Sequence, residues 1–283
     1  GLSGASQFQP QVDFMVMNLQ VSEGLTVQAG TPVTGLFQFR GFSDGPDVQG
    51  NPLIGNSPAD MITAGEGVKL IGSFDSFGFD LTINKGFGEV LSSPTGGNTG
   101  LNYIGKFAYT GSDLLSVGAG VAFQSGKQGI VFASGDGEHY NLNDGNPISS
   151  RNTHAAFPND GVITQGNASI TPSASFDVNL WGGIASGDGD ASAGYGGIGA
   201  KADVSDNFYL AGRFTIASDQ SDGLADGADE TLTRFQGGIG VTLYERALLK
   251  VEGFTQSHGD TAITRPADMD GFAGVMTELS FSF

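Results

Sequence analysis

Residues 272–283 read FAGVMTELSFSF, and the alternation within them indicates the fold class of the whole chain. One set of alternate residues is largely apolar: Ala273, Val275, Thr277, Leu279, Phe281 and Phe283. The other set is mostly small or polar: Gly274, Met276, Glu278, Ser280 and Ser282. A period of two residues is that of a β-strand with two unlike faces. One face of this strand suits lipid and the other suits water.

The same alternation recurs in segments of about 9–12 residues, the length that a tilted strand needs to cross a bilayer. The clearest segments are 101–109, 115–123, 208–216 and 235–243. No stretch reaches the roughly 18 consecutive apolar residues of a membrane helix. Glycine makes up 47 of the 283 residues and charged residues only 15 %. This composition is typical of many strands joined by many turns rather than of a soluble enzyme.

The connections between these segments alternate between short and long. Short turns fall near 22–24, 75–76, 111–113, 171–175, 205–207 and 245–246, and longer Gly/Asp/Asn-rich stretches lie at roughly 32–62, 89–99, 125–162, 187–191, 218–230 and 258–268. Outer-membrane barrels have short periplasmic turns and longer extracellular loops. Aromatic residues such as Phe74 and Phe77 flank the short turns, which indicates an interfacial aromatic girdle. The alternative, a soluble β-sandwich with aromatics packed at one end, does not account for this coincidence.

The chain is therefore predicted to be one domain over residues 1–283, an all-β antiparallel transmembrane β-barrel in the outer membrane of a Gram-negative-type cell. Fourteen strands are favoured over twelve. The larger count includes a strand in 12–21 and needs another in residues 1–10, which show little alternation. Segments 125–162 and 218–230 are predicted to be extracellular, and the turns at 75–76 and 245–246 periplasmic.

The C-terminal pattern Val275-x-Thr277-x-Leu279-x-Phe281-x-Phe283 resembles the terminal strand of bacterial outer-membrane porins. In that family the assembly machinery recognises this strand, so the resemblance implies that these five residues form an assembly signal. A second stretch, 24–32, looks like a hairpin strand of phosphate-selective-type porins, but phosphate selectivity is not carried across. The porin resemblance implies a passive channel for small hydrophilic solutes, in contact with outer-membrane lipids and lipopolysaccharide. A homo-oligomer, such as a trimer, is a further expectation.

Alternation also predicts which charged residues face the interior of the barrel. Lys and Arg facing lipid at the midplane cost about 2–4 kcal/mol, so an inward orientation is their default. The predicted pore-lining residues are Lys69, Asp80, Lys106, Asp177, Arg213, Arg234, Lys250, Glu252 and Glu278. They either set a transverse field across a constriction or neutralise one another in a solvated lumen, and both interpretations stay open. The porin resemblance implies that a long loop, 125–162 or else 32–62, folds inward.

Other functional classes have less support. A net charge of −18 argues against nucleic acid as a partner. The three histidines, His139, His154 and His258, lie in predicted loops without a catalytic motif, so we expect no enzyme activity. No resident metal or cofactor is expected. Calcium at acidic loop residues is the weaker alternative, because no known calcium motif is matched. These residues are Asp188, Asp190, Asp219, Asp222, Asp226, Asp229 and Glu230.

Two further barrel functions remain as alternatives to a porin. An autotransporter-type translocator has a helix before its first strand, whereas residues 1–21 lack helical periodicity and contain Pro10. A structural or adhesive barrel has a filled lumen, and side chains fill a barrel of about eight strands but not one of fourteen. For a porin, acidic loops around the mouth predict a mild cation preference, opposed by the inward lysines and arginines.

Overall fold

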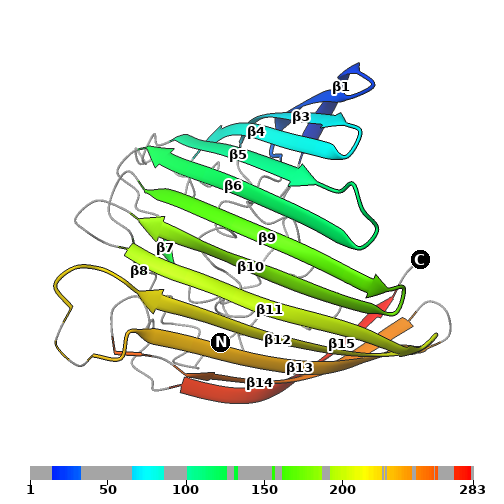
Figure 1. Cartoon of the computed structure of the whole chain (residues 1–283), viewed down its shortest axis with the longest axis vertical. Coiled ribbons are helices and arrows are strands. Elements are labelled where there is room, and N and C mark those ends of the chain that lie inside the picture. Colours follow the sequence, from blue (N-terminus) through cyan, green and yellow to red (C-terminus); the bar gives the residue numbers. More distant parts are fainter. Residues whose placement is uncertain are drawn as a thin grey trace, which may run out of the picture.

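One continuous antiparallel sheet dominates the computed structural model (Figure 1). The structure describes residues 15–32, 66–85, 101–125, 131–132, 155–156, 161–186, 192–224, 226, 228–243, 247–257, 259–260 and 271–281. Within them, thirteen strands follow one another in chain order and pair antiparallel: β1 (Val16–Ser22), β2 (Leu25–Gly30), β3 (Gly67–Phe74), β4 (Phe77–Lys85), β5 (Leu101–Tyr109), β6 (Leu115–Ser125), β9 (Val162–Ser173), β10 (Phe176–Ser186), β11 (Ser192–Ser205), β12 (Phe208–Asp219), β13 (Thr231–Leu243), β14 (Ala247–Ser257) and β15 (Gly271–Phe281).

Two short strands, β7 (Val131–Phe132) and β8 (Ala155–Ala156), pair only with each other, between β6 and β9 in the chain. The large sheet curves strongly, and its strands are inclined in a common direction (Figure 1). Within the described residues β1 and β15 are its two edge strands. Among those residues, no helix is long and apolar enough to span a membrane.

The predicted all-β antiparallel architecture is confirmed. Consecutive strands are joined at one end of the sheet by short turns, such as Asp75-Ser76, and at the other by longer connections such as 86–100. Asp75 takes a positive φ of 49°, which an aspartate tolerates in a tight turn. Within the described residues the large sheet has thirteen strands, and the fourteenth was expected in residues 1–10, which lie outside them.

The two faces of the sheet are inverted relative to a soluble protein. Large apolar side chains are exposed on the outer face, among them Leu81 at 52 % and Val275 at 74 %. On the opposite face Arg234 is 0 % and Glu252 is 1 % exposed. Soluble proteins bury their apolar residues and rarely bury charged ones, whereas a membrane barrel turns its apolar side chains toward lipid. The β-sandwich alternative is therefore wrong.

Aromatic side chains gather on the outer face beside the short turns, as predicted. The ring of Phe77 lies 5.6 Å from that of Phe107 and 5.0 Å from that of Tyr109. Phe74 and Phe176 are exposed beside two of these turns. Aromatic rings of this kind mark the level of a membrane–water interface. The short-turn end of the sheet therefore carries one side of an interfacial girdle.

Candidate channel wall

A three-residue charge cluster lies on the inner face of β3, β4 and β5. The Nζ atoms of Lys69 and Lys106 each lie 3.0 Å from Oδ2 of Asp80. The register explains the cluster: Asp80 is directly opposite Lys106, and Lys69 is opposite Thr82, two residues further along Asp80's own strand. Residues opposite each other in antiparallel strands share a face, and their diagonal neighbours are within reach of long side chains. Two ammonium groups thus share one carboxylate, and the charges of these three side chains sum to about +1.

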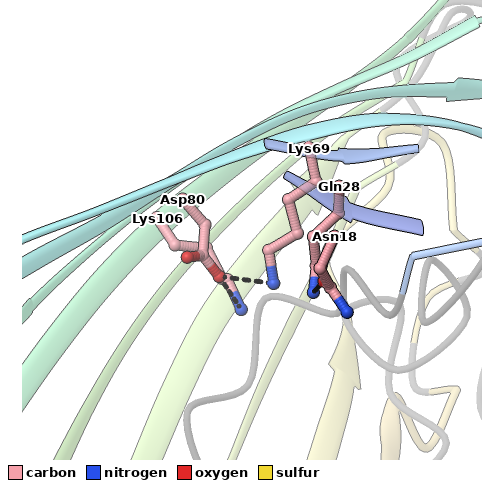
Figure 2. A network of polar contacts seen from close by, with 5 residues as sticks. All are labelled: Asn18, Gln28, Lys69, Asp80 and Lys106. Atoms are coloured by element: carbon pink, nitrogen blue, oxygen red, sulfur yellow. Dashed lines mark hydrogen bonds and ion pairs between the residues drawn. The ribbon is translucent and has the colours of Figure 1, made fainter. Parts of the chain in front are cut away.

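The same face continues onto β1 and β2. The Nε2 atom of Gln28 donates a hydrogen bond of 2.8 Å to Oδ1 of Asn18, and Gln28 lies opposite Lys69 in the register. The side chains of Asn18, Gln28, Lys69, Asp80 and Lys106 all project to the same side of the sheet (Figure 2). Uncharged amides and charged groups together therefore line this part of the wall.

A second polar group extends across β12, β13 and β14. The Nε atom of Arg213 donates to Oε1 of Gln236 at 3.0 Å, and Nε2 of Gln236 donates in turn to Oε1 of Glu252. All three side chains are buried. Gln236 connects the guanidinium to the carboxylate through both ends of its amide. Hydrogen bonds that engage ionised groups are stronger than neutral ones, so this chain fixes the position of both charges.

Arg234 lies beside this chain, over an aromatic ring. Its guanidinium carbon is 4.6 Å from the centroid of the Phe254 ring, and its Nη1 donates to Oε1 of Gln256 at 3.5 Å. A guanidinium over an aromatic face gains a cation–π attraction. Lys250 is buried on the same face and lies opposite Glu278 in the register. The side chain of Glu278 lies outside what the structure describes.

The structure therefore places the predicted inward residues as follows. Lys69, Arg213, Arg234, Lys250 and Glu252 are buried on the inner face. Asp80 and Lys106 are 19 % and 21 % exposed at the side chain. Asp177 is half-buried and accepts a hydrogen bond of 2.9 Å from the hydroxyl of Thr171. Among the predicted assembly residues, Val275 is exposed on the outer face. The Phe281 side chain and the whole of Phe283 lie outside the described part.

Sequence reasoning missed one inner cation. The Nζ atom of Lys201 lies 3.2 Å from Oδ1 of Asp203 and 5.0 Å from the centroid of the Tyr209 ring. It lies opposite Asp177 in the register, near the short turns. The odd or even position of Lys201 along β11 could have identified it as inward-facing, but the glycines of 194–199 interrupt the alternation of apolar and polar residues in that strand. Also missed were the buried amide side chains of Asn84, Gln165, Asn167, Asn179, Gln236 and Gln256.

Inner aromatic residues lie flat along the wall. A Cβ atom added to Gly197 would overlap the ring of Trp181, which is opposite it on β10. A Cβ added to Gly240 would likewise overlap the ring of Tyr209. Glycine here allows a ring to pack against the backbone of the next strand instead of projecting away from the wall. This packing gives the strand glycine at 197 a structural role.

The acidic residues near the long-loop end make local contacts. An oxygen of Asp219 accepts a hydrogen bond of 3.0 Å from the backbone of Ser221, and Asp260 accepts one of 3.3 Å from the backbone of Asp229. No group of three or more His, Asp and Glu side chains that could hold a metal ion occurs among the residues that the structure describes. Calcium binding by these loops stays a prediction.

The chain resembles solved structures although its sequence matches no family model and no curated protein. Outer-membrane expressed OmpT of Vibrio cholerae matches with a TM-score of 0.57 at 13 % identity, over 94 % of this chain and 80 % of the other. The fold is that of an outer-membrane β-barrel. An anion-selective porin from Comamonas acidovorans matches with a TM-score of 0.59 at 14 % identity, over 95 % and 77 % of the two chains. A further porin structure matches with a TM-score of 0.53 at 14 % identity, over 95 % and 80 %.

An outer-membrane location is consistent with both the fold and the exposed apolar face. These identities are too low to carry a function across.

Proposed function

We propose that this barrel is a porin, a passive channel for small hydrophilic solutes and ions. One observation carries the proposal: the inner face of the sheet is lined with charged and amide side chains while the outer face is apolar. A barrel whose interior served only as a core would gain more from apolar side chains there, because burying charges without water is costly. A polar wall is the lining that a water-filled channel requires.

Small residues on the inner face favour the porin over a filled structural barrel. The register aligns Gly78, Ala108 and Gly118 across β4, β5 and β6. None of these side chains extends far from the wall. The inner aromatic rings of Trp181 and Tyr209 lie against neighbouring strands, which also leaves interior width. The described residues give the translocator alternative no comparable support.

We further propose a mild preference for cations. The chain carries a net charge of −18, whereas most of the described wall cations have acids close by. Asp80 contacts two lysines, Asp203 contacts Lys201, and Glu252 is connected to a guanidinium through Gln236. Wall charges compensated in this way act over short distances, since salt screens them over about 8 Å at physiological ionic strength. The acidic excess lies elsewhere in the chain and attracts cations toward the channel.

Planar-bilayer recording tests this proposal. Purified protein added to one side should produce stepwise increases in current. Under a salt gradient, the reversal potential should have the sign of a channel that conducts cations better than anions. A reversal potential of the opposite sign would show that the wall bases dominate. The double variant Lys106→Gln/Arg213→Gln should then reverse the sign of the reversal potential. Correctly folded protein that gives no current would refute the porin and favour a structural barrel.

A homotrimer is part of the proposal, in contact with outer-membrane lipid and lipopolysaccharide. In vitro folded OmpT of Vibrio cholerae in a trimer form resembles this chain with a TM-score of 0.53. The continuous apolar outer face offers surface both to lipid and to neighbouring copies. Chemical crosslinking in native membranes, followed by gel electrophoresis without heating, should show a species of three times the monomer mass.

A further inference from the structure

A hollow of about 310 Å³ lies against the wall beside the Lys69–Asp80–Lys106 cluster. One row of the register crosses it: Ser73 is opposite Gly78, Gly78 is opposite Ala108, and Ala108 is opposite Gly118. The next residue in this row is Asn167 on β9. Four consecutive small side chains in one row leave a depression beside the longer side chains of Ile71, Asp80 and Lys106, which form the next row on this face.

The rim of the hollow is charged. Asp80 and Lys106 belong to its lining, and they lie two residues from Gly78 and Ala108 on β4 and β5. Lys69 joins the same carboxylate at 3.0 Å. Two ammonium groups share one carboxylate, so the charges of these three side chains sum to about +1, which one monoanion would balance.

Charge and shape together point to one class of ligand. We propose that this hollow is a binding subsite for small monocarboxylates with a compact apolar body. The carboxylate would accept hydrogen bonds from Lys106 at the rim, and the apolar body would rest on the small-residue floor beside Ile71. The subsite rests on the proposed porin function, since it names a class of solute that this channel would retain. The charge of the subsite acts over only a few ångströms, so the subsite is compatible with a cation preference that is set at the mouth of the channel.

Benzoate is a suitable probe, with neutral benzamide and cationic benzylammonium as controls of similar size. Binding to the full chain, folded in detergent, is measured by saturation-transfer NMR, and heat-modifiable gel migration verifies the fold of each variant. Benzoate should bind and the two controls should not. Lys106→Gln should weaken binding about tenfold, because it removes a charge-assisted hydrogen bond. Lys106→Arg should retain most of it.

Two more variants separate shape from charge. Ala108→Leu fills the hollow and leaves the cluster charged, so benzoate binding should be lost. Asp80→Asn raises the local charge and should tighten binding. The matched control is Lys201→Gln, which removes an inner lysine outside the hollow and should leave benzoate binding unchanged. Equal binding of benzoate and benzamide, or unchanged binding in both Lys106→Gln and Ala108→Leu, would overturn the subsite.

Recording from the same preparations keeps the two proposals distinguishable. Current without benzoate binding would refute the subsite and leave the porin. Benzoate binding without any current would refute the porin and leave a carboxylate site in a closed barrel. Current that benzoate reduces in the wild type but not in Ala108→Leu supports both.

Discussion

Leu81 offers a direct test of which face meets lipid. It is the fifth of the nine residues of β4, near the middle of the membrane-spanning segment, and its side chain is 52 % exposed on the outer face. Its cross-strand neighbours are Leu70 and Gly105, so an arginine there would find no acid opposite it. Leu81→Arg should therefore destabilise the folded barrel by about 2–4 kcal/mol, the cost of a lipid-facing arginine at the midplane.

That cost corresponds to a decrease of roughly 30- to 1000-fold in the ratio of folded to unfolded protein. Denaturant unfolding in lipid vesicles measures it, with the fluorescence of Trp181, the only tryptophan in the chain, as the signal. Leu81→Met controls for the loss of leucine and should cost far less. Ser116→Arg places the same charge on the inner face of β6 and should be tolerated. Equal destabilisation by Leu81→Arg and Ser116→Arg would refute the assignment of the faces.

Three further predictions concern packing, assembly and sidedness. Gly197→Val should destabilise the barrel by about 1–3 kcal/mol in the same unfolding assay, because the valine side chain would overlap the ring of Trp181. Gly237→Val is the control and should cost clearly less, since no atom lies within 4 Å of a Cβ added at Gly237. Equal costs for the two variants would contradict the packing of Trp181 against Gly197. Deletion of Phe283 should reduce the amount of barrel in the outer membrane far more than Phe272→Ala does, and normal assembly of the deletion would show the C-terminal resemblance to be accidental. An epitope tag within 125–162 should be labelled on intact cells, and labelling only after permeabilisation would invert the topology.

The strands and their faces could be predicted because alternation is local information. β5 coincides with the predicted segment 101–109, and the inward position of Lys106 follows from its parity with Asn102. A side chain's face depends only on its odd or even position in a strand. β13 begins at Thr231, four residues before the predicted 235, since Thr231–Arg234 carry no clear apolar set.

The charge clusters could not be predicted, because they depend on register between strands. Asp80 meets Lys106 only because the register between β4 and β5 puts these two residues opposite each other. Nothing in one strand's alternation specifies that offset. The hollow at Gly78 and Ala108 has the same origin, since its floor exists only where small residues of several strands fall in one row.

The central claim is that small hydrophilic solutes pass through this barrel, and liposome swelling tests it most directly. Vesicles containing the folded protein are placed in isotonic solutions of neutral sugars of increasing size, and swelling is followed by the decrease in light scattering. Pentoses should enter rapidly and trisaccharides slowly or not at all, as a water-filled lumen of limited width requires. Vesicles that contain folded barrel but do not swell in any sugar would contradict the account.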